Sequence, residues 1–538
     1  MIEKYKPKTW VDYKTPITAD ELNRMEDGIL NATNAINAYQ IMTGFSYTPV
    51  LDGMSDLELE ITARYETART GKVFATKHNK FAVNTSSYGE KILDSVGLNC
   101  TPSTDKTVGQ DDFIQYLPFQ WEHVNYVRDD DDGFARPIAI EGRSNYKTSG
   151  TVDVGSMSAT FWWKYVEDET SYTIYLSDMP HPELGLVPWY EAVKADGSVY
   201  PYYIGSSYAS VIASDGLLRS QPNLSPDYTQ SHNSMISNYQ KKGKGYWGCG
   251  TEFTLHGLIF SEIKYGTANV QKYAQGCTGY SFQTKCALGE TGVKRVLSKS
   301  AWACDVGNVV SVGKANGTNT DRNNTSMNSL ANRVRVKSME TVVIDGTTYY
   351  ALNLDTNTTF DTDTDTYVSS MPCYSGETDA VVDHYDGSVV SNTNQRHTFR
   401  LHGREYMNGQ YYVSANAGLK MIDGNWHVMV APKGEKHNTG LTGYVDSGYI
   451  PYNGGTDYWV GEWNCNPAYG QTFPSAKGSS NSLGVGDMAY VGGANVAENS
   501  TREYLIGGHL WNWSDAGLLL VSCWTRLGYS WWNIASHD

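Results

Sequence analysis

The chain is poor in charged residues and lacks the signs of secretion or membrane insertion. Lys, Arg, Asp and Glu make up only 19% of its 538 residues, and the formal net charge is −16. This acidic balance does not suit nucleic-acid backbones or anionic membrane surfaces, both of which attract basic patches. No stretch reaches the ~18 apolar residues of a membrane helix, and the start lacks a signal-peptide core. We therefore expect a chain made in the cytoplasm, with no nucleic-acid partner and no membrane insertion.

Catalytic and metal-binding motifs are also missing from the sequence. The eight cysteines are scattered and form no CxxC pair, so we expect buried free thiols rather than a disulfide framework. HExxH, GxSxG, the phosphate-binding GxxxxGK[ST] and a GxGxxG before a helix do not occur. The twelve histidines are dispersed, without a pair at helical spacing beside a third zinc ligand. The sequence predicts no catalytic residue, no metal site and no cofactor.

Two acidic runs and one tripeptide leave calcium open as an alternative. Asp129–Asp132 precedes Gly133, and Asp361, Asp363 and Asp365 alternate with threonine. Carboxylates are ligands that Ca²⁺ prefers, but neither run has the downstream glutamate of an EF-hand loop. Gln221-Pro222-Asn223 is similar to a sugar-binding tripeptide of calcium-dependent lectins, yet no Trp-Asn-Asp partner follows it. Solvated turns are the favoured interpretation of both runs.

Aromatic residues are abundant, and they reach 12% of the chain. Tyr (39) and Trp (15) exceed Phe (13). Tyr and Trp combine a rigid apolar face with one polar group, which suits recognition surfaces. The alternative is that they reflect β-structure, because aromatic residues also favour strands.

Short strands and dense turns predict a mainly β (α+β) fold. Residues 161–165 and 172–176 are strand-like, and Asp-Gly turn pairs recur, as at Asp215-Gly216, Asp345-Gly346 and Asp423-Gly424. A helix is predicted near 252–264, ending at Gly266. Another opens the chain, where Thr18 and Glu21 form a capping box. Its apolar residues step by three and four as in a short coiled-coil seam: Leu22, Met25, Ile29, Ala32 and Ile36.

These patterns predict four regions. Residues 1–45 form a helical segment for oligomerisation or attachment, and 46–110 form a linker or a small β region. An aromatic, β-rich region over 111–225 leads into a large C-terminal domain over 226–538. Within that domain, residues of about 330–395 are a candidate insertion.

Three blocks resemble variable proteins that diversity-generating retroelements diversify in phage tails. The last block runs from Tyr504 to Leu518 and closes with Trp531-Trp532-Asn533-Ile534. Residues 258–280, with strand-like segments at 309–313 and 399–405, are similar to the C-type-lectin fold of such proteins. Residues 10–29 are similar to the N-termini of tail and baseplate proteins from phages of Gram-positive hosts.

The resemblance implies a C-type-lectin-like domain over 226–538 whose variable ligand-binding region is 504–538. Its framework would include Gly507, Gly508, Ser514, Ala516, Gly517, Trp532, Asn533 and Ile534. We expect Trp532 and residues 518–521 to be mainly buried. The positions that it implies as variable and ligand-binding are His509, Trp511, Asn512, Trp513, Asp515, Leu520, Ser522, Trp524, Thr525, Tyr529 and Trp531.

The function that the resemblance implies is adhesion of a phage tail to a bacterial surface receptor, either protein or glycan. The chain would then be a virion protein, bound to other tail proteins through its N-terminus and trimeric. Two alternatives stay open. One is an enzyme that acts on glycans or cell walls, including a relative of formylglycine-generating enzymes, which share the lectin-like fold. The other is a structural baseplate adapter that binds only virion proteins.

Overall fold

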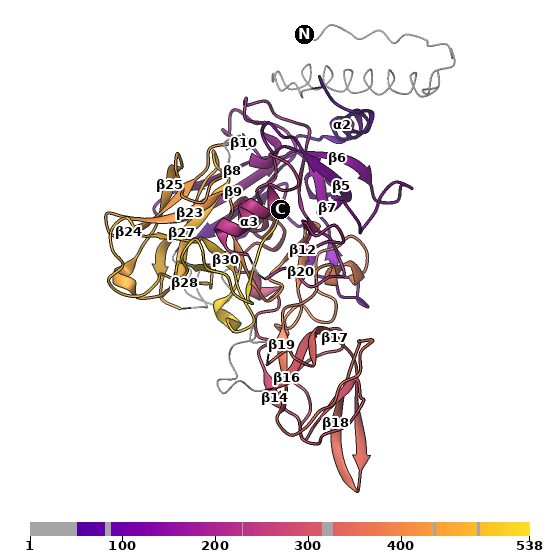
Figure 1. Ribbon diagram of the computed structural model, residues 1–538. Coiled ribbons are helices and arrows are strands. Elements are labelled where there is room, and N and C mark those ends of the chain that lie inside the picture. The colour runs from indigo at the N-terminus through magenta and orange to yellow at the C-terminus, as the bar shows by residue number, and fades with distance from the viewer. Residues whose placement is uncertain (1–50, 81–87, 229, 315–325, 434–436, 481–484) are drawn as a thin grey trace.

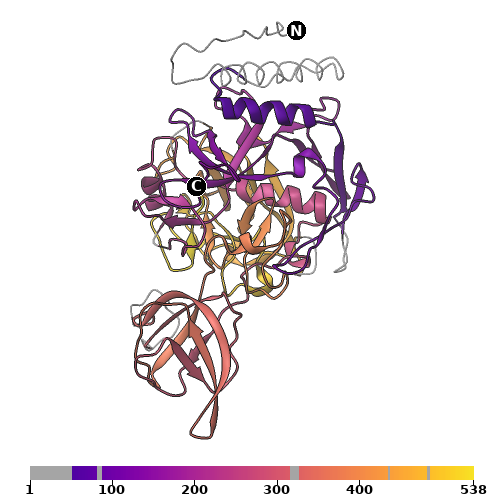
Figure 2. The same cartoon turned by 90° about the vertical axis from the view of Figure 1, so that its right-hand side faces the viewer.

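The computed structural model describes residues 51–538 except 81–87, 229, 315–325, 434–436 and 481–484. The helix expected over 18–36, and the whole segment 1–45, lie outside the described residues. The described chain is mainly β with few helices, as the sequence predicts. The described residues of the N-terminal half and of the C-terminal end form one large body, and a smaller β unit projects from it (Figures 1 and 2).

Helix α2 (Asp56–Ala68) lies along one side of the body (Figure 2). Ser55 caps it: its hydroxyl accepts the Glu58 N–H, and the Glu58 carboxylate accepts the Ser55 N–H at 2.7 Å. This capping box satisfies two amide groups that a helix start otherwise leaves unpaired. This helix was not among the predicted elements, although Ser-x-x-Glu before an apolar residue is the usual sequence signal of a helix start.

Two antiparallel sheets build the N-terminal half. The five-stranded sheet has the order β10 (Val187–Pro188), β8 (Trp162–Glu167), β9 (Ser171–Ser177), β1 (Val73–Asn79) and β2 (Glu90–Leu93). The four-stranded sheet has the order β11 (Tyr202–Ser206), β7 (Asp153–Ala159), β5 (Glu122–Arg128) and β6 (Ala135–Ile140). Strands β8 and β9 confirm the two predicted strands. Because β1 and β2 belong to the same sheet as β8–β10, the expected boundary at residue 110 falls within one sheet.

Helix α4 (Glu252–Phe260) runs through the centre of the body and is buried at every residue. A π-helical turn, η3 (Ser261–Tyr265), continues it and ends at Gly266, whose φ of 71° is the left-handed conformation that glycine tolerates. Both confirm the helix predicted over 252–264. A shorter helix, α3 (His232–Tyr239), precedes them. Strands from both halves of the chain pack around α4 in one large core.

The projecting unit is a six-stranded antiparallel sheet (Figure 1). Its order is β14 (Gln283–Lys285), β19 (Thr366–Met371), β16 (Val309–Lys314), β17 (Ala331–Ile344), β18 (Thr347–Leu354) and β15 (Arg295–Ser298). Asp345-Gly346 forms the predicted turn between β17 and β18, with φ values of 48° and 74°. The unit spans 283–371, so it begins before residue 330 and ends before residue 395, the two bounds expected for the insertion.

A seven-stranded mixed sheet dominates the C-terminal half. Its order is β27 (Gln471–Gly478), β26 (Tyr458–Asn466), β28 (Met488–Tyr490), β31 (Val521–Ser522), β30 (Leu505–Gly507), β22 (Tyr411–Val413) and β32 (Ile534–Ala535). The pairs β28–β31 and β22–β32 are parallel, and β30 is antiparallel to both of its neighbours. This sheet therefore gathers four short segments from the last fifty residues.

Smaller elements complete the body. A four-stranded sheet has the order β25 (Val445–Ile450), β24 (Asn425–Val430), β23 (Ala417–Ile422) and β29 (Thr501–Arg502). Three two-stranded pairs are β3–β4 (Cys100–Thr101 and Gln110–Asp111), β12–β13 (Ser210–Ile212 and Leu218–Ser220) and β20–β21 (Phe399–Leu401 and Arg404–Tyr406). The 3₁₀ turns are η1 (Leu117–Phe119), η2 (Tyr190–Ala192), η4 (Val270–Lys272), η5 (Glu377–Ala380), η6 (Asn453–Gly455) and η7 (Trp513–Asp515). In the described part of the chain, every helix is too short or too polar to span a bilayer.

Candidate ligand-binding pocket

One face of the seven-stranded sheet forms the floor of a large, mainly apolar pocket. Side chains alternate between the two faces of a strand. In β28, β31, β30, β22 and β32 one set of alternating residues belongs to the large core: Ala489, Val521, Ile506, Tyr412 and Ala535. The register places the other set on the opposite face, and these residues line the pocket: Tyr490, Ser522, Leu505, Tyr411 and Ile534.

Two loops beyond the sheet form the walls. The loop after β30 contributes His509, Trp511 and Asn512, and the loop after β31 contributes Trp524, Thr525, Arg526, Tyr529, Trp531 and Asn533. The pocket volume is about 660 Å³, within the ~300–1,000 Å³ that ligand sites commonly have. Its open side exposes two large rings, since Trp524 is 53% and Tyr529 43% accessible.

Hydrogen bonds hold the first wall loop to the sheet. The Tyr490 hydroxyl donates to Asp515 Oδ2 at 2.7 Å and accepts Asn512 Nδ2 at 3.3 Å. Asn512 Oδ1 accepts the His509 N–H at 2.8 Å, which closes the loop on itself. Asp487, on the strand side, accepts the Leu519 N–H at 2.7 Å. The loop is therefore pre-organised, which lowers the entropy that a ligand must offset.

A chain of aromatic rings joins the walls to the interior. Tyr411 meets His509 at 4.7 Å between ring centroids, and Trp511 meets Trp532 at 5.4 Å. Trp531 extends the chain, with its ring 6.2 Å from that of Trp532. Trp532 is fully buried, as the sequence analysis expects, and lies in the apolar cluster that joins the body to the projecting unit. Edge-to-face contacts of this kind fix ring orientations.

Eight of the eleven implied ligand positions line this pocket. They are His509, Trp511, Asn512, Ser522, Trp524, Thr525, Tyr529 and Trp531. Trp513 is 53% exposed but lies outside the pocket, with its ring against Gly279. Asp515 is also outside the lining and supports the wall from behind by accepting the Tyr490 hydroxyl.

The expectation that Leu520 binds ligand is wrong. It has no accessible surface and belongs to the large core, so the structure leaves it no face for a ligand. The physical reason is that residues 518–521 form a buried apolar run that leads into β31. Their hydrophobicity already predicts this burial.

Sequence reasoning missed six lining residues: Tyr411, Tyr490, Leu505, Arg526, Asn533 and Ile534. Tyr411 lies far upstream of residues 504–538 and Tyr490 lies shortly before them, and the strand order brings both under the loops. No local pattern signals that pairing. Arg526 lies inside the implied variable region. Its position between Trp524 and Trp531 is a sequence signal from which it could have been predicted, because Trp and Arg are common in binding sites.

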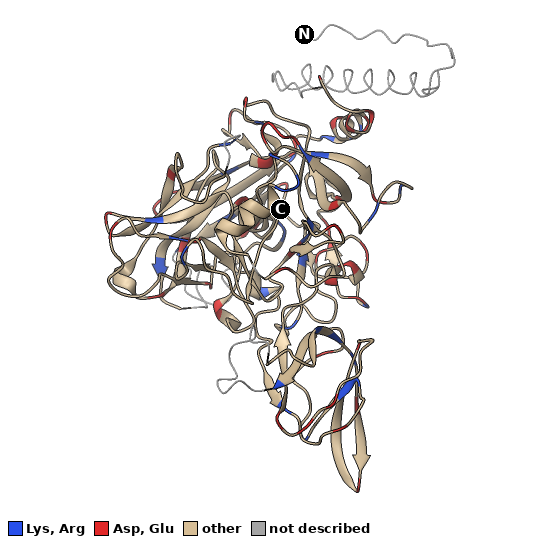
Figure 3. Cartoon of the chain, viewed as in Figure 1, with Lys and Arg blue, Asp and Glu red and all other residues tan. Residues whose placement is uncertain are grey.

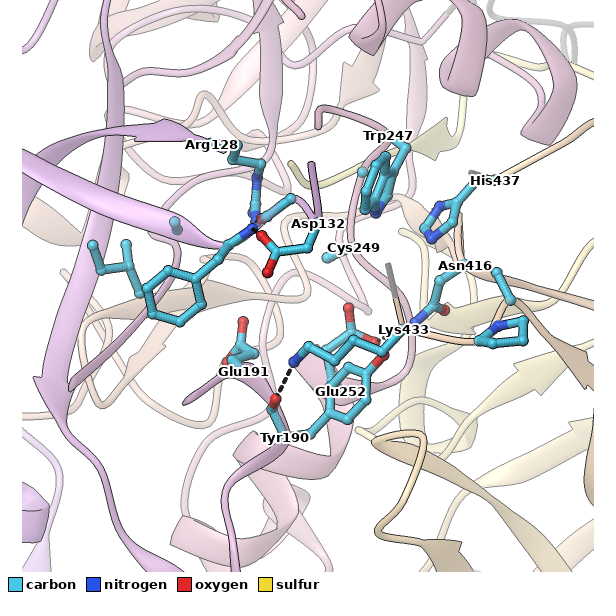
Figure 4. Close-up of a pocket in the computed structure, with 17 residues that line it drawn as sticks. Arg128, Asp132, Tyr190, Glu191, Trp247, Cys249, Glu252, Asn416, Lys433 and His437 are labelled. Atoms are coloured by element: carbon cyan, nitrogen blue, oxygen red, sulfur yellow. Dashed lines mark hydrogen bonds between the residues drawn. The ribbon is translucent and has the colours of Figure 1, made fainter. Parts of the chain in front are cut away.

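A second, polar cavity lies between the two halves of the body (Figure 4). It measures about 70 Å³ and its lining includes Glu191, Glu252, Lys433, Cys249 and His437. Figure 4 shows the Lys433 side chain reaching across the cavity, where its ammonium donates to the Tyr190 carbonyl oxygen. The volume holds a few water molecules and is far below that of sites for drug-sized ligands.

The carboxyl groups around this cavity have protein partners. Glu252 accepts the Gly250 N–H at 2.7 Å and Asn416 Nδ2 at 2.9 Å, while Glu191 accepts Arg404 at 2.6 Å. Burial raises the pKa of Glu252 to about 7 and lowers the pKa of Lys433 to about 8. Burial also raises the pKa of the Cys249 thiol well above its ordinary value, so this thiol is a poor nucleophile at neutral pH.

Basic side chains neutralise the acidic groups that suggested cations. Cys100, Asp111 and Asp386 lie close together, and the Lys264 ammonium occupies their centre at 2.7 Å from Asp111 and 2.5 Å from Asp386. In the acidic runs, Asp129 pairs with Arg136 and Lys194, Asp132 with Lys194, Asp363 with Lys314 and Asp365 with Lys285. Lys and Arg are interspersed with Asp and Glu over the body and the projecting unit (Figure 3).

The tripeptide Gln221-Pro222-Asn223 has a structural role in the backbone. The Gln221 amide donates to the carbonyl oxygens of Gly150 and Val152 at 2.8 and 2.7 Å. Asn223 has a φ of 66°, a turn conformation that asparagine adopts more readily than most residues. These contacts account for the tripeptide without a bound ion.

Stability should fall as the pH rises from about 6.5 to 8. Burial raises the pKa of Glu503 and of Asp487 to about 8. The folded carboxyl groups therefore keep protons that the unfolded chain releases above its pKa of about 4. Buried neutral histidines such as His232, whose pKa burial lowers to about 4, act in the opposite direction only below about 6.5.

Glu503→Gln tests this pH effect beside the pocket. Glu503 accepts Thr525 Oγ1 at 3.0 Å and the His232 N–H at 3.0 Å, and glutamine keeps an acceptor there. We expect the melting temperature of the wild type to drop between pH 6.5 and 8, and the drop to be smaller in the variant. If the melting temperature fell equally with pH in both proteins, Glu503 would not be a source of the pH effect.

The sequence matches none of the family models and none of the curated proteins with which it was compared.

Proposed function

We propose that the chain is a receptor-binding protein of a phage tail, and that the aromatic pocket binds a ligand on the bacterial surface. The observation that carries this proposal is that eight positions implied by the resemblance alone line one pocket. Seven of these residues come from two loops that are separate in sequence, Ser522 comes from β31, and they gather over a sheet whose opposite face is core. This is the arrangement expected if a rigid frame displays exchangeable side chains.

The wider assignment follows from the same proposal. Residues 226–538 would form a C-type-lectin-like domain with a hypervariable surface over 504–538. The segment 1–45 would attach the protein to other tail proteins in a homotrimer, whose avidity would multiply a weak single-site affinity. Binding would be non-covalent and would need neither a metal nor a cofactor.

Cell binding tests the proposal. Fluorescently labelled protein should bind at least one strain of a panel of Gram-positive bacteria, with saturation and with competition by unlabelled protein. Absence of saturable binding to every strain would contradict it. A structural baseplate adapter would behave in that way, and the last codons of its gene would not differ between close relatives.

The polar cavity favours an enzyme as the second candidate, because Glu252 and Lys433 ionise near neutral pH in a buried site. Bacterial envelopes incubated with the protein should then release soluble sugars, and Glu252→Gln should stop the release. The receptor-binding proposal predicts no release by either protein, together with unchanged cell binding by the variant.

A further inference from the structure

Arg526 in the lining of the aromatic pocket and the nearby Arg502 outside it have no acidic partner within the described residues. Among the described residues of the lining, Arg526 is the one Lys, Arg, Asp or Glu, and its side chain forms no salt bridge to any described carboxylate. Arg502 also lacks a salt bridge in the described part of the chain, and its Nε is buried without a hydrogen-bond partner. Burial lowers the pKa of Arg502, and the nearby positive charge of Arg526 lowers it further. In the described part of the chain neither of these two guanidinium groups has a carboxylate within salt-bridge distance, although the whole chain has a net charge of −16.

The described lining of the pocket contains no Asp or Glu, and two nearby acidic side chains lie outside it. Asp515 accepts the Tyr490 hydroxyl and lies outside the lining. Glu503 is fully buried, and burial raises its pKa to about 8, so it is largely protonated at neutral pH. Arg526 therefore supplies the charge of the described lining, and this part of the pocket is complementary to an anion.

A buried acceptor belongs to a residue of the pocket lining. Asn533 is 3% exposed and lines the pocket, and its Oδ1 forms no hydrogen bond within the described residues. Leaving such an atom unpaired costs about 1–3 kcal/mol, so a ligand that supplies a donor would gain from pairing with it. A sugar hydroxyl is a donor of that kind. The exposed faces of Trp524 and Tyr529 offer flat apolar surfaces on which the C–H face of a sugar ring can stack.

From these observations we propose that the pocket binds an anionic glycan, with sugar rings against Trp524 and Tyr529 and a carboxylate or phosphate at Arg526. The inference rests on the proposed function, because it names the ligand class of the same site. It requires no calcium. Guanidinium groups bind both anions through paired, charge-assisted hydrogen bonds, so carboxylated and phosphorylated glycans share this chemistry.

Arg526→Gln is the decisive variant, and Lys477→Gln is its matched control. Arg526 is exposed and its side chain forms no hydrogen bond within the described residues, so the fold does not depend on it. Lys477 is equally exposed on the edge strand β27 and lies outside the pocket. We expect about ten-fold or greater loss of affinity for Arg526→Gln and a change within about two-fold for Lys477→Gln.

Binding is measured on an array of carboxylated, phosphorylated and neutral glycans, and on bacteria treated with periodate or with protease. The expected result is binding to one anionic class on the array, and cell binding that periodate abolishes and protease spares. The array distinguishes carboxylate from phosphate, and added salt should weaken the wild type more than Arg526→Gln.

Three results would overturn the inference. If the protein bound neutral and anionic glycans equally and Arg526→Gln had no effect, the ligand would not need an anionic group. Cell binding that protease abolishes and periodate spares would identify a protein ligand and would leave the proposed function intact. Absence of binding to all cells and all glycans would remove both proposals.

Discussion

Replacing Trp524 by alanine should weaken receptor binding by about 30- to 1,000-fold and leave folding nearly unchanged. Trp524 lines the pocket with one side against Gly493, and 53% of its surface stays accessible. A tryptophan at the centre of a binding site commonly contributes about 2–4 kcal/mol, and each 1.4 kcal/mol is about ten-fold in affinity. Because the ring contacts little of the core, its removal leaves no large cavity.

Trp513→Ala is the matched control for Trp524. Trp513 has the same 53% accessibility and also rests on a glycine, Gly279, but it lies outside the pocket. We expect it to bind cells within about two-fold of the wild type. Binding curves of both variants on a susceptible strain, with thermal unfolding as the folding check, decide the point. Equal losses in the two variants would mean that exposed tryptophans bind without regard to the pocket.

Asparagine at position 520 should unfold or strongly destabilise the protein, whereas asparagine at position 529 should abolish binding and preserve the fold. Leu520 is completely buried. Its loss costs about 2–5 kcal/mol, and an unpaired amide in its place adds about 1–3 kcal/mol. Tyr529 is 43% exposed in the pocket wall.

Denaturant unfolding and cell binding, measured on Leu520→Asn and Tyr529→Asn, separate the two roles. A stable Leu520→Asn protein would show that residues 518–521 are not part of the rigid frame. Loss of soluble Tyr529→Asn protein would show that the wall loop holds the fold instead of displaying side chains.

Local chemistry in the sequence was enough to predict several elements. The apolar run with Gly266 behind it predicts α4 and η3, and Asp-Gly pairs predict the turns at 215–216, 345–346 and 423–424, which join paired strands. Each signal lies within a few residues of the structure that it specifies. Helix α2 was equally predictable from its capping box.

The pairing of distant segments could not be predicted in this way. Strand β1 pairs with β9 about a hundred residues later, and β22 pairs with β30 and β32 near the chain end. Strands of two or three residues have too little alternation to specify a face or a partner. For the same reason Tyr411 and Tyr490 were not expected in the pocket, while Leu520 was placed there by resemblance and excluded by its burial.

The most direct test of the pocket is oxidative footprinting of the protein free in solution and bound to cells. Side-chain oxidation, read by mass spectrometry, reports the accessibility of individual rings. We expect Trp524 and Tyr529 to become protected on binding and Trp513 to remain as reactive as in the free protein. Protection of Trp513 with Trp524 and Tyr529 unchanged would place the contact elsewhere and contradict the account.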